Sequence, residues 1–158
     1  MLTVAAGQSL TLTLQGSDPN GLSLTYAGRV DSLAYHLKST LGLSSSGNYY
    51  TNWGGGGEQW VQGAGGAWYY ILPSGAFYKW SGSGLSGTFV AQLDPSYNAN
   101  PSLLVNAQPG QGQATVSISG STLTITPNAG FSGLLYVTAT VSDGYATASQ
   151  AFKLTVTS

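Results

Sequence analysis

The amino-acid sequence predicts a mainly β-stranded fold: a β-sandwich with one short helix and an inserted lobe that carries an aromatic β-hairpin. Residues 114–156 form four runs of alternating apolar and polar residues separated by turn signals, and residues 2–26 alternate in the same way. Short alternating runs at regular spacing are typical of a sandwich. Between them, residues 48–80 contain ten aromatic side chains, including all four tryptophans. We therefore predict one sandwich domain over residues 1–158, in which residues 31–106 are inserted as a helix and an aromatic, glycine-rich β lobe.

Length and composition bound the class of protein. The 158 residues suit one domain with a small inserted lobe, and 42% hydrophobic residues are enough for a core. Charged residues make up only 6% and the net charge is −1, whereas charged residues are about 25% of an average globular chain. Four basic residues predict no nucleic-acid binding. The absence of cysteine excludes disulfides and thiol chemistry.

The sequence also bears on location. No apolar run approaches the ~20 residues of a membrane span, so we expect no insertion into a membrane. Residues Met1–Val4 lack the basic and apolar regions of a signal peptide. We therefore expect a module excised from a longer protein whose targeting signal lies elsewhere.

The N-terminal residues predict two strands joined by a turn. Residues 2–4 and 9–14 alternate and predict a half-buried strand. Residues 16–21, Gly-Ser-Asp-Pro-Asn-Gly, are a dense turn signal, because Pro fixes φ while Asn and Gly tolerate positive φ. Residues 22–26 then alternate again, which predicts a hairpin-like pair.

The segment Asp31–Leu43 predicts a helix. Asp31 is placed to cap its first turn, and Gly42 is a typical C-terminal stop. One apolar stripe follows the helical period and comprises Leu33, Ala34, Leu37 and Leu41.

The middle of the chain predicts the aromatic hairpin. Residues 67–72 and 76–80 flank the turn signal Pro73-Ser74-Gly75, and alternation places aromatic side chains on both faces of the hairpin. Three segments follow: a predicted strand at 88–93, a loop at 94–101 in which two prolines disfavour a central strand, and a short strand at 103–105.

The last third of the chain is the most regular. It predicts four strands, at 114–118, 122–126, 134–141 and 146–156. Asp143-Gly144 between the last two is a type I′ hairpin signal.

Two segments, 16–26 (GSDPNGLSLTY) and 116–156, resemble the bacterial cadherin-like and immunoglobulin-like repeats that occur in tandem in very large secreted or surface proteins. The matching motifs are an early Asp-Pro turn, a P-x-x-x-F-x-G pattern and a V-x-D-G pattern. They fall on Pro127, Phe131 and Gly133, and on Val141, Asp143 and Gly144. The resemblance covers about half the chain and implies a sandwich in a secreted or cell-surface protein. The insert lies outside it, although GAWYYILPSGAFYKW is similar to the aromatic hairpins of choline-type cell-wall-binding repeats.

The aromatic insert is a candidate glycan or partner surface. Sugars stack on flat aromatic rings, and amide and carboxylate groups supply hydrogen bonds. The alternative is that the rings form a small core, in which tilted or edge-to-face packing is preferred. The candidate residues are Tyr49, Tyr50, Trp53, Glu58, Trp60, Trp68, Tyr70, Tyr78 and Trp80.

Calcium is a second candidate ligand, and no other cofactor is expected. The resemblance implies that acidic residues in the early and late turns can bind Ca²⁺ at domain junctions. Here these positions hold Asp18, Asn20 and Asp143. A hard cation needs six to eight oxygens, and the alternative is that the three residues stabilise their own turns.

The sequence does not predict an enzyme. Its single histidine, His36, lies in the predicted helix, and its single glutamate is Glu58. Glycoside hydrolysis requires two placed carboxylates, and no spacing here supplies them. We expect a structural and adhesive module of a secreted or cell-surface protein, whose partners are neighbouring modules or copies of itself. Binding of polysaccharide through the aromatic insert is the alternative.

Overall fold

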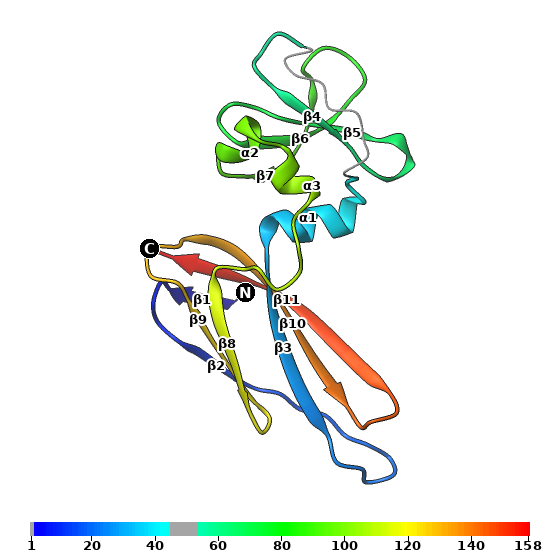
Figure 1. The fold of residues 1–158 in the computed structure, drawn as a ribbon, viewed down its shortest axis with the longest axis vertical. Coiled ribbons are helices and arrows are strands. Elements are labelled where there is room, and N and C mark those ends of the chain that lie inside the picture. Colours follow the sequence, from blue (N-terminus) through cyan, green and yellow to red (C-terminus); the bar gives the residue numbers. More distant parts are fainter. Residues whose placement is uncertain (1, 45–53) are drawn as a thin grey trace. The chain divides into compact units, whose positions relative to one another are not determined.

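The computed structural model describes residues 2–44 and 54–158, and the chain divides into two compact units (Figure 1). Residues 1–33 and 108–158 form the first unit, which we call the sandwich. Residues 34–107 form the second unit, which we call the lobe. The sequence predicts an insert over 31–106, in the same part of the chain.

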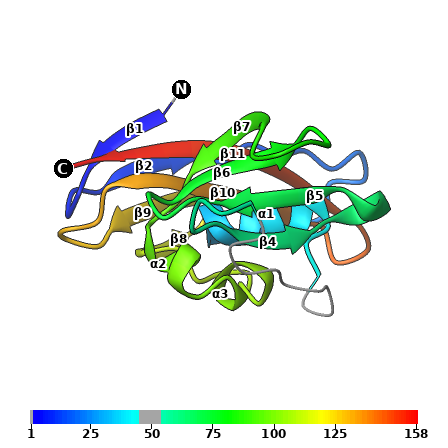
Figure 2. The same cartoon turned by 90° about the horizontal axis from the view of Figure 1, so that it is seen from above.

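The sandwich consists of two sheets. The first sheet has the strand order β1-β11-β10-β3 and the second has the order β2-β9-β8. Their bounds are β1 (Leu2–Ala5), β2 (Leu10–Thr13), β3 (Thr25–Ser32), β8 (Ala114–Ser119), β9 (Thr122–Pro127), β10 (Gly133–Ser142) and β11 (Thr147–Thr157). Strand β1 runs parallel to β11, and the other pairs are antiparallel. Figure 2 shows β1 beside β11, with both ends of the chain on that side.

Alternate residues of these strands meet between the two sheets. Leu123 and Ile125 from β9 face the core with Leu135 and Val137 from β10, and all four are buried. Period-two burial of this kind gives each strand one inward face. The four strands predicted over 114–156 are confirmed, with ends that differ by one or two residues.

The predicted N-terminal hairpin is wrong. Strand β2 pairs with β9 and strand β3 pairs with β10, so the two lie in different sheets. Residues 22–24 precede β3, which starts at Thr25. The turn at 16–21 therefore connects the two layers of the sandwich instead of closing a hairpin.

The predicted role of Asp31 as a helix cap is also wrong, because β3 continues through Asp31 to Ser32. The carboxylate of Asp31 is buried and accepts two hydrogen bonds of 2.9 Å from the Arg29 guanidinium and one of 2.7 Å from the Gly110 amide. Buried carboxylates require such partners. Pairing with a distant segment therefore keeps this acidic residue in a strand.

The lobe contains a four-stranded antiparallel sheet with the order β4-β5-β6-β7 (Figure 2). In Figure 1, helices α1 and α3 lie on one side of this sheet. The bounds are α1 (Leu33–Leu41), β4 (Gln59–Gln62), η1 (Ala64–Gly66), β5 (Trp68–Ile71), β6 (Ala76–Trp80), β7 (Gly87–Gln92), α2 (Ser96–Ala99) and α3 (Ser102–Val105). The helix, the aromatic hairpin and the returning strand are confirmed at these places. The predicted strand at 103–105 is wrong: it belongs to α3, which follows Pro101 at φ −66° and is closed by a 2.9 Å bond from the Asn106 amide to the Ser102 carbonyl.

The hairpin turn between β5 and β6 depends on Gly75. Its φ is +90°, its amide donates to the Leu72 carbonyl at 2.8 Å, and its carbonyl accepts from the Leu93 amide at 3.0 Å. A Cβ atom at this position would lie 2.1 Å from the Leu93 carbonyl oxygen. Gly75 thus joins the turn to the end of β7 and leaves no room for a side chain.

We predict that Gly75→Ala destabilises the lobe by at least about 2 kcal/mol, because it adds a backbone clash to the unfavourable positive φ. Urea unfolding followed by tryptophan fluorescence measures this, since all four tryptophans belong to the lobe. Gly65→Ala is the control, because Gly65 has φ +71° and no atom near its would-be Cβ, and it should cost about 1 kcal/mol. Equal losses in the two variants would contradict the role of the clash.

Candidate functional site

A row of aromatic side chains crosses the lobe sheet on one face. The strand register places Trp60, Tyr70, Tyr78 and Phe89 opposite one another on β4, β5, β6 and β7. Neighbouring ring centroids are 5.1, 5.3 and 5.5 Å apart along this row. Cross-strand aromatic pairs at such distances stabilise a sheet beyond the area they bury, so the row is a structural element in its own right.

The row passes from the interior of the lobe to its surface. Trp60 and Tyr70 are buried, Tyr78 is half-buried and Phe89 is 54% exposed. Trp80 also contacts Trp60, with centroids 5.6 Å apart and rings at 90°. Trp60 is tilted by 46° against Tyr70, whereas Tyr70 and Tyr78 are stacked at 10°. These geometries occur in packed aromatic cores, and the perpendicular Trp60 and Trp80 do not form one flat platform for a sugar.

The carboxylate of Glu58 anchors the buried end of this row. It accepts hydrogen bonds from the amides of Gly54 and Gly56, the second at 2.9 Å, and from the Trp60 indole nitrogen at 3.0 Å. Burial by itself raises the pKa of Glu58, but the bonds from Trp60 and the glycine amides outweigh it and hold that pKa below its usual value. Glu58 is therefore a buried anion that accepts hydrogen bonds from the glycine amides before it and from the Trp60 ring.

Residues 54–57 form the glycine loop, and close packing requires glycine at two of its positions. A Cβ at Gly54 would lie 2.8 Å from the Leu85 side chain, and one at Gly56 would lie 2.6 Å from it. The Leu85 carbonyl in turn accepts a 2.9 Å hydrogen bond from the Tyr70 hydroxyl, and burial raises the pKa of that tyrosine. The run of glycines, which has no pattern of a phosphate loop, lets backbone amides converge on a carboxylate.

The residues of the predicted glycan surface differ in how far they are buried. Glu58, Trp60 and Tyr70 are buried, so they do not present a ring face or a carboxylate to a ligand. Trp68, Tyr78 and Trp80 are half-buried. Tyr49, Tyr50 and Trp53 lie outside the described residues. For the three buried side chains, the structure favours the alternative interpretation, a small aromatic core.

The candidate calcium ligands are close together at one end of the sandwich. Asp18 accepts from the amides of Asn20 at 2.7 Å and Leu22 at 3.1 Å. Asp143 accepts from the amides of Tyr145 and Ala146, both at 2.7 Å. These amide bonds, followed by a hydrogen bond with the Asp18 side chain, hold the pKa of Asp143 below its usual value. Both carboxylates therefore act as turn acceptors, as the alternative interpretation expects, and calcium binding stays a prediction.

The part of the chain that the structure describes has no cluster of side chains suited to a metal ion. Within residues 2–44 and 54–158, no three of His, Cys, Asp and Glu come together as metal ligands. His36 lies on α1 in the lobe. No helix among the same residues has the length and apolarity needed to cross a membrane.

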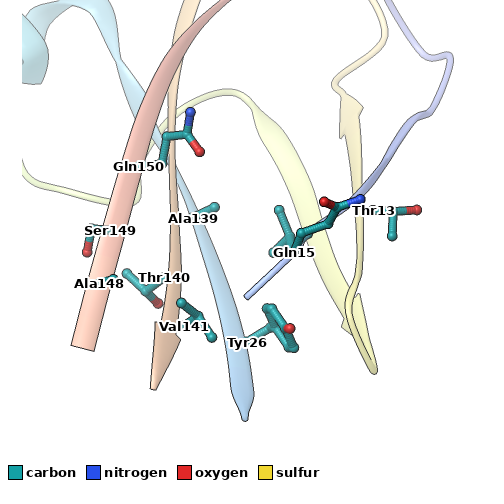
Figure 3. Close-up of a pocket in the computed structure, with 10 residues that line it drawn as sticks. Thr13, Gln15, Tyr26, Ala139, Thr140, Val141, Ala148, Ser149 and Gln150 are labelled. Atoms are coloured by element: carbon teal, nitrogen blue, oxygen red, sulfur yellow. The ribbon is translucent and has the colours of Figure 1, made fainter. Parts of the chain in front are cut away.

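The sandwich has an open edge on β11 with a pocket beside it. Strand β1 pairs with residues 154–157 of β11, so, among the described residues, 147–153 have a neighbour strand on one side only, β10. The adjacent pocket has a volume of about 430 Å³ (Figure 3). It is lined by Thr13, Leu14, Gln15, Tyr26, Ala139, Thr140, Val141, Ala148, Ser149 and Gln150. Sequence analysis identified β11 as a strand but did not find this pocket.

Two stacked sheets with the orders β1-β11-β10-β3 and β2-β9-β8 define an immunoglobulin-like β-sandwich. Residues 80–157 match the family model of the bacterial Ig domain. The match supports a bacterial immunoglobulin-like repeat, and domains of this family are generally non-enzymatic modules. No curated protein matches the chain.

We predict that Glu58→Gln destabilises the lobe by about 2 kcal/mol, because a buried charged acceptor with three donors is replaced by a neutral amide. Urea unfolding followed by tryptophan fluorescence is the measurement. Asp94→Asn is the matched control: the exposed Asp94 carboxylate accepts from the Ser96 amide, and the asparagine oxygen can keep that bond. A loss as large in the control as in Glu58→Gln would argue against a special role for the buried anion.

The lowered pKa of Glu58 also predicts a pH dependence. A depressed pKa means that the folded lobe binds this proton less readily than the unfolded chain. The stabilisation is therefore complete above the unfolded value of about 4.3 and is lost as the pH falls through the folded value. We expect the stability gap between wild type and Glu58→Gln to narrow as the pH drops below about 4.3. A gap that stays constant down to the acid transition would show that the charge is not involved.

Proposed function

We propose that this protein is a non-enzymatic structural and adhesive module of a large secreted or surface-exposed bacterial protein, and that it acts through protein–protein contacts. The open edge of β11 is the observation that carries this proposal. Exposed edges with few charges pair readily with other strands. Residues 147–153, Thr-Ala-Ser-Gln-Ala-Phe-Lys, contain a single charged side chain.

Other surface features support the same proposal. Leu22 and Tyr145 are exposed on the sandwich, and Phe89 and Leu103 are exposed on the lobe. With 6% charged residues and a net charge of −1, the chain has little electrostatic repulsion to keep neighbours apart. Neighbouring modules and further copies of the chain are the partners that such a surface suits.

The proposal predicts that neutral microbeads coated with the chain cluster, and that clustering increases with coating density because many weak contacts act together. Light microscopy and turbidity measure clustering, and albumin-coated beads are the control. Beads that stay dispersed at every density would contradict adhesion between copies. Clustering that soluble cell-wall polysaccharide abolishes would favour the carbohydrate-binding alternative.

A further inference from the structure

Alternate residues of β11 direct their backbone N–H and C=O groups toward the open edge of the strand. The Ala6 amide donates to the Thr157 carbonyl at 2.8 Å, so Thr157 directs its backbone groups to the β1 side of the strand. Backbone direction alternates along a strand. The N–H and C=O groups of Thr147, Ser149 and Ala151 therefore face the same side, where no strand of the described chain pairs with them. The backbone of Lys153 faces this side too, but its C=O lies against Leu2, the first residue of β1.

This edge lacks the usual protections. The register between β10 and β11 runs without a shift from Gly133 to Ser142, so no bulge bends the strand. The segment contains no proline, and its one charge, Lys153, lies at its end. Strand β7 in the lobe is different, because a register shift opposite Phe77 and Tyr78 leaves one extra residue in its edge. Bulges and charges are the devices that normally prevent edge pairing.

The pocket beside this edge leaves space on its inner side. Ala139 and Ala148 have small side chains, and β2 ends at Thr13, so the sheets are not filled against each other here. Figure 3 shows Gln150 on one side of the pocket and Gln15 on the other. Gln150 is exposed, and its side chain is uncharged. Residues 147–152 contain no charged side chain, and beside the pocket an incoming strand meets the small Ala148 and the uncharged Gln150.

From these observations we infer that two copies of the chain pair through the open edges of their β11 strands, antiparallel, about a two-fold axis at Gln150. This inference rests on the proposed function and names its partner and register. Ser149 then exchanges backbone hydrogen bonds with Ala151 of the second copy, and the two copies form this pair twice, once on each side of the axis. Gln150 faces Gln150 of the second copy in a non-hydrogen-bonded pair.

A second copy suits this edge better than an unrelated extended segment. Antiparallel pairing about a two-fold axis satisfies both open edges at once, and the same patch serves on both partners. An unrelated segment satisfies one edge and adds a new open edge of its own. The charges also fit, because the two Lys153 side chains lie at opposite ends of the paired segment, each across from a threonine.

Cysteine cross-linking tests the register, because the chain has no cysteine of its own. Opposed residues of a non-hydrogen-bonded pair have Cα atoms about 4.5 Å apart, within reach of a disulfide. We expect Gln150→Cys to form a covalent dimer under mild oxidation at least about tenfold faster than Ser149→Cys. The two Ser149 positions are diagonal neighbours, roughly 7–8 Å apart, and do not fit a disulfide. Equal rates in the two variants would overturn the register.

Sedimentation equilibrium tests the edge itself. Ser149→Pro removes an N–H that faces the open edge and keeps the ladder to β10, a position where edge strands tolerate proline. We expect it to weaken self-association at least about tenfold, whereas Ser149→Ala, which retains the N–H, behaves as wild type. Circular dichroism checks that both variants are folded, and the cross-linking result stands if Ser149→Pro fails to fold.

The outcomes separate this inference from the proposed function. A wild-type chain that stays monomeric at all concentrations, with no preferential cross-linking at position 150, overturns the paired edge. If beads coated with Ser149→Pro cluster as strongly as wild-type beads, the paired edge is wrong while adhesion stands. If wild-type beads do not cluster either, the proposed function fails with it.

Discussion

The structure depends on the hydrogen bonds that hold together the two points where the chain leaves and re-enters the sandwich. Asp31 in the outgoing strand is buried and accepts from Arg29 two residues before it and from the Gly110 amide of the returning segment. The Gly112 amide adds a 3.0 Å bond to the Val30 carbonyl. A buried aspartate without such partners is strongly destabilising. Because both ends of the insertion are fixed within the sandwich, and because closure entropy grows slowly with loop length, a lobe of this size can interrupt the sandwich between β3 and β8.

In the lobe, the buried polar atoms of an aromatic core and the amides of a glycine loop must find hydrogen-bond partners. Buried tryptophan and tyrosine rings carry polar atoms that need partners, and here the Trp60 indole donates to Glu58 while the Tyr70 hydroxyl donates to the Leu85 carbonyl. The same glutamate satisfies two loop amides. One anion therefore joins the loop and the ring row, and glycine is needed where Leu85 packs on the loop. Buried polar groups of this kind stabilise only when every member is satisfied.

Prediction from sequence succeeded where a local pattern was enough. Alternation and Asp143-Gly144 located the strands over 114–157, and Pro73-Ser74-Gly75 located the aromatic hairpin. It failed where a distant partner decides the outcome: Asp31 resembles a helix cap unless Gly110 is known to reach it, and a short apolar run such as 103–105 is ambiguous between strand and helix until Pro101 sets its start. The alternation did indicate that aromatic side chains lie on both faces of this hairpin. It did not indicate that Glu58 is buried, because four preceding glycines carry no periodic signal and the Leu85 contact lies far along the chain.

The low charge of the chain matters most at its strand edges. A protein with abundant lysine and glutamate protects its edges with side chains, whereas this one has few charges to place and must rely on geometry. Strand β7 has that geometry, in the form of its register shift, and β11 does not. In β11 the first seven residues are left open because β1 is short and pairs only with the end of the strand. An edge of seven residues gives weak pairing between isolated copies, but weak contacts become effective when many copies are held at high local concentration. Under the proposed function, the unprotected edge of β11 is therefore the contact that assembly of many copies would use.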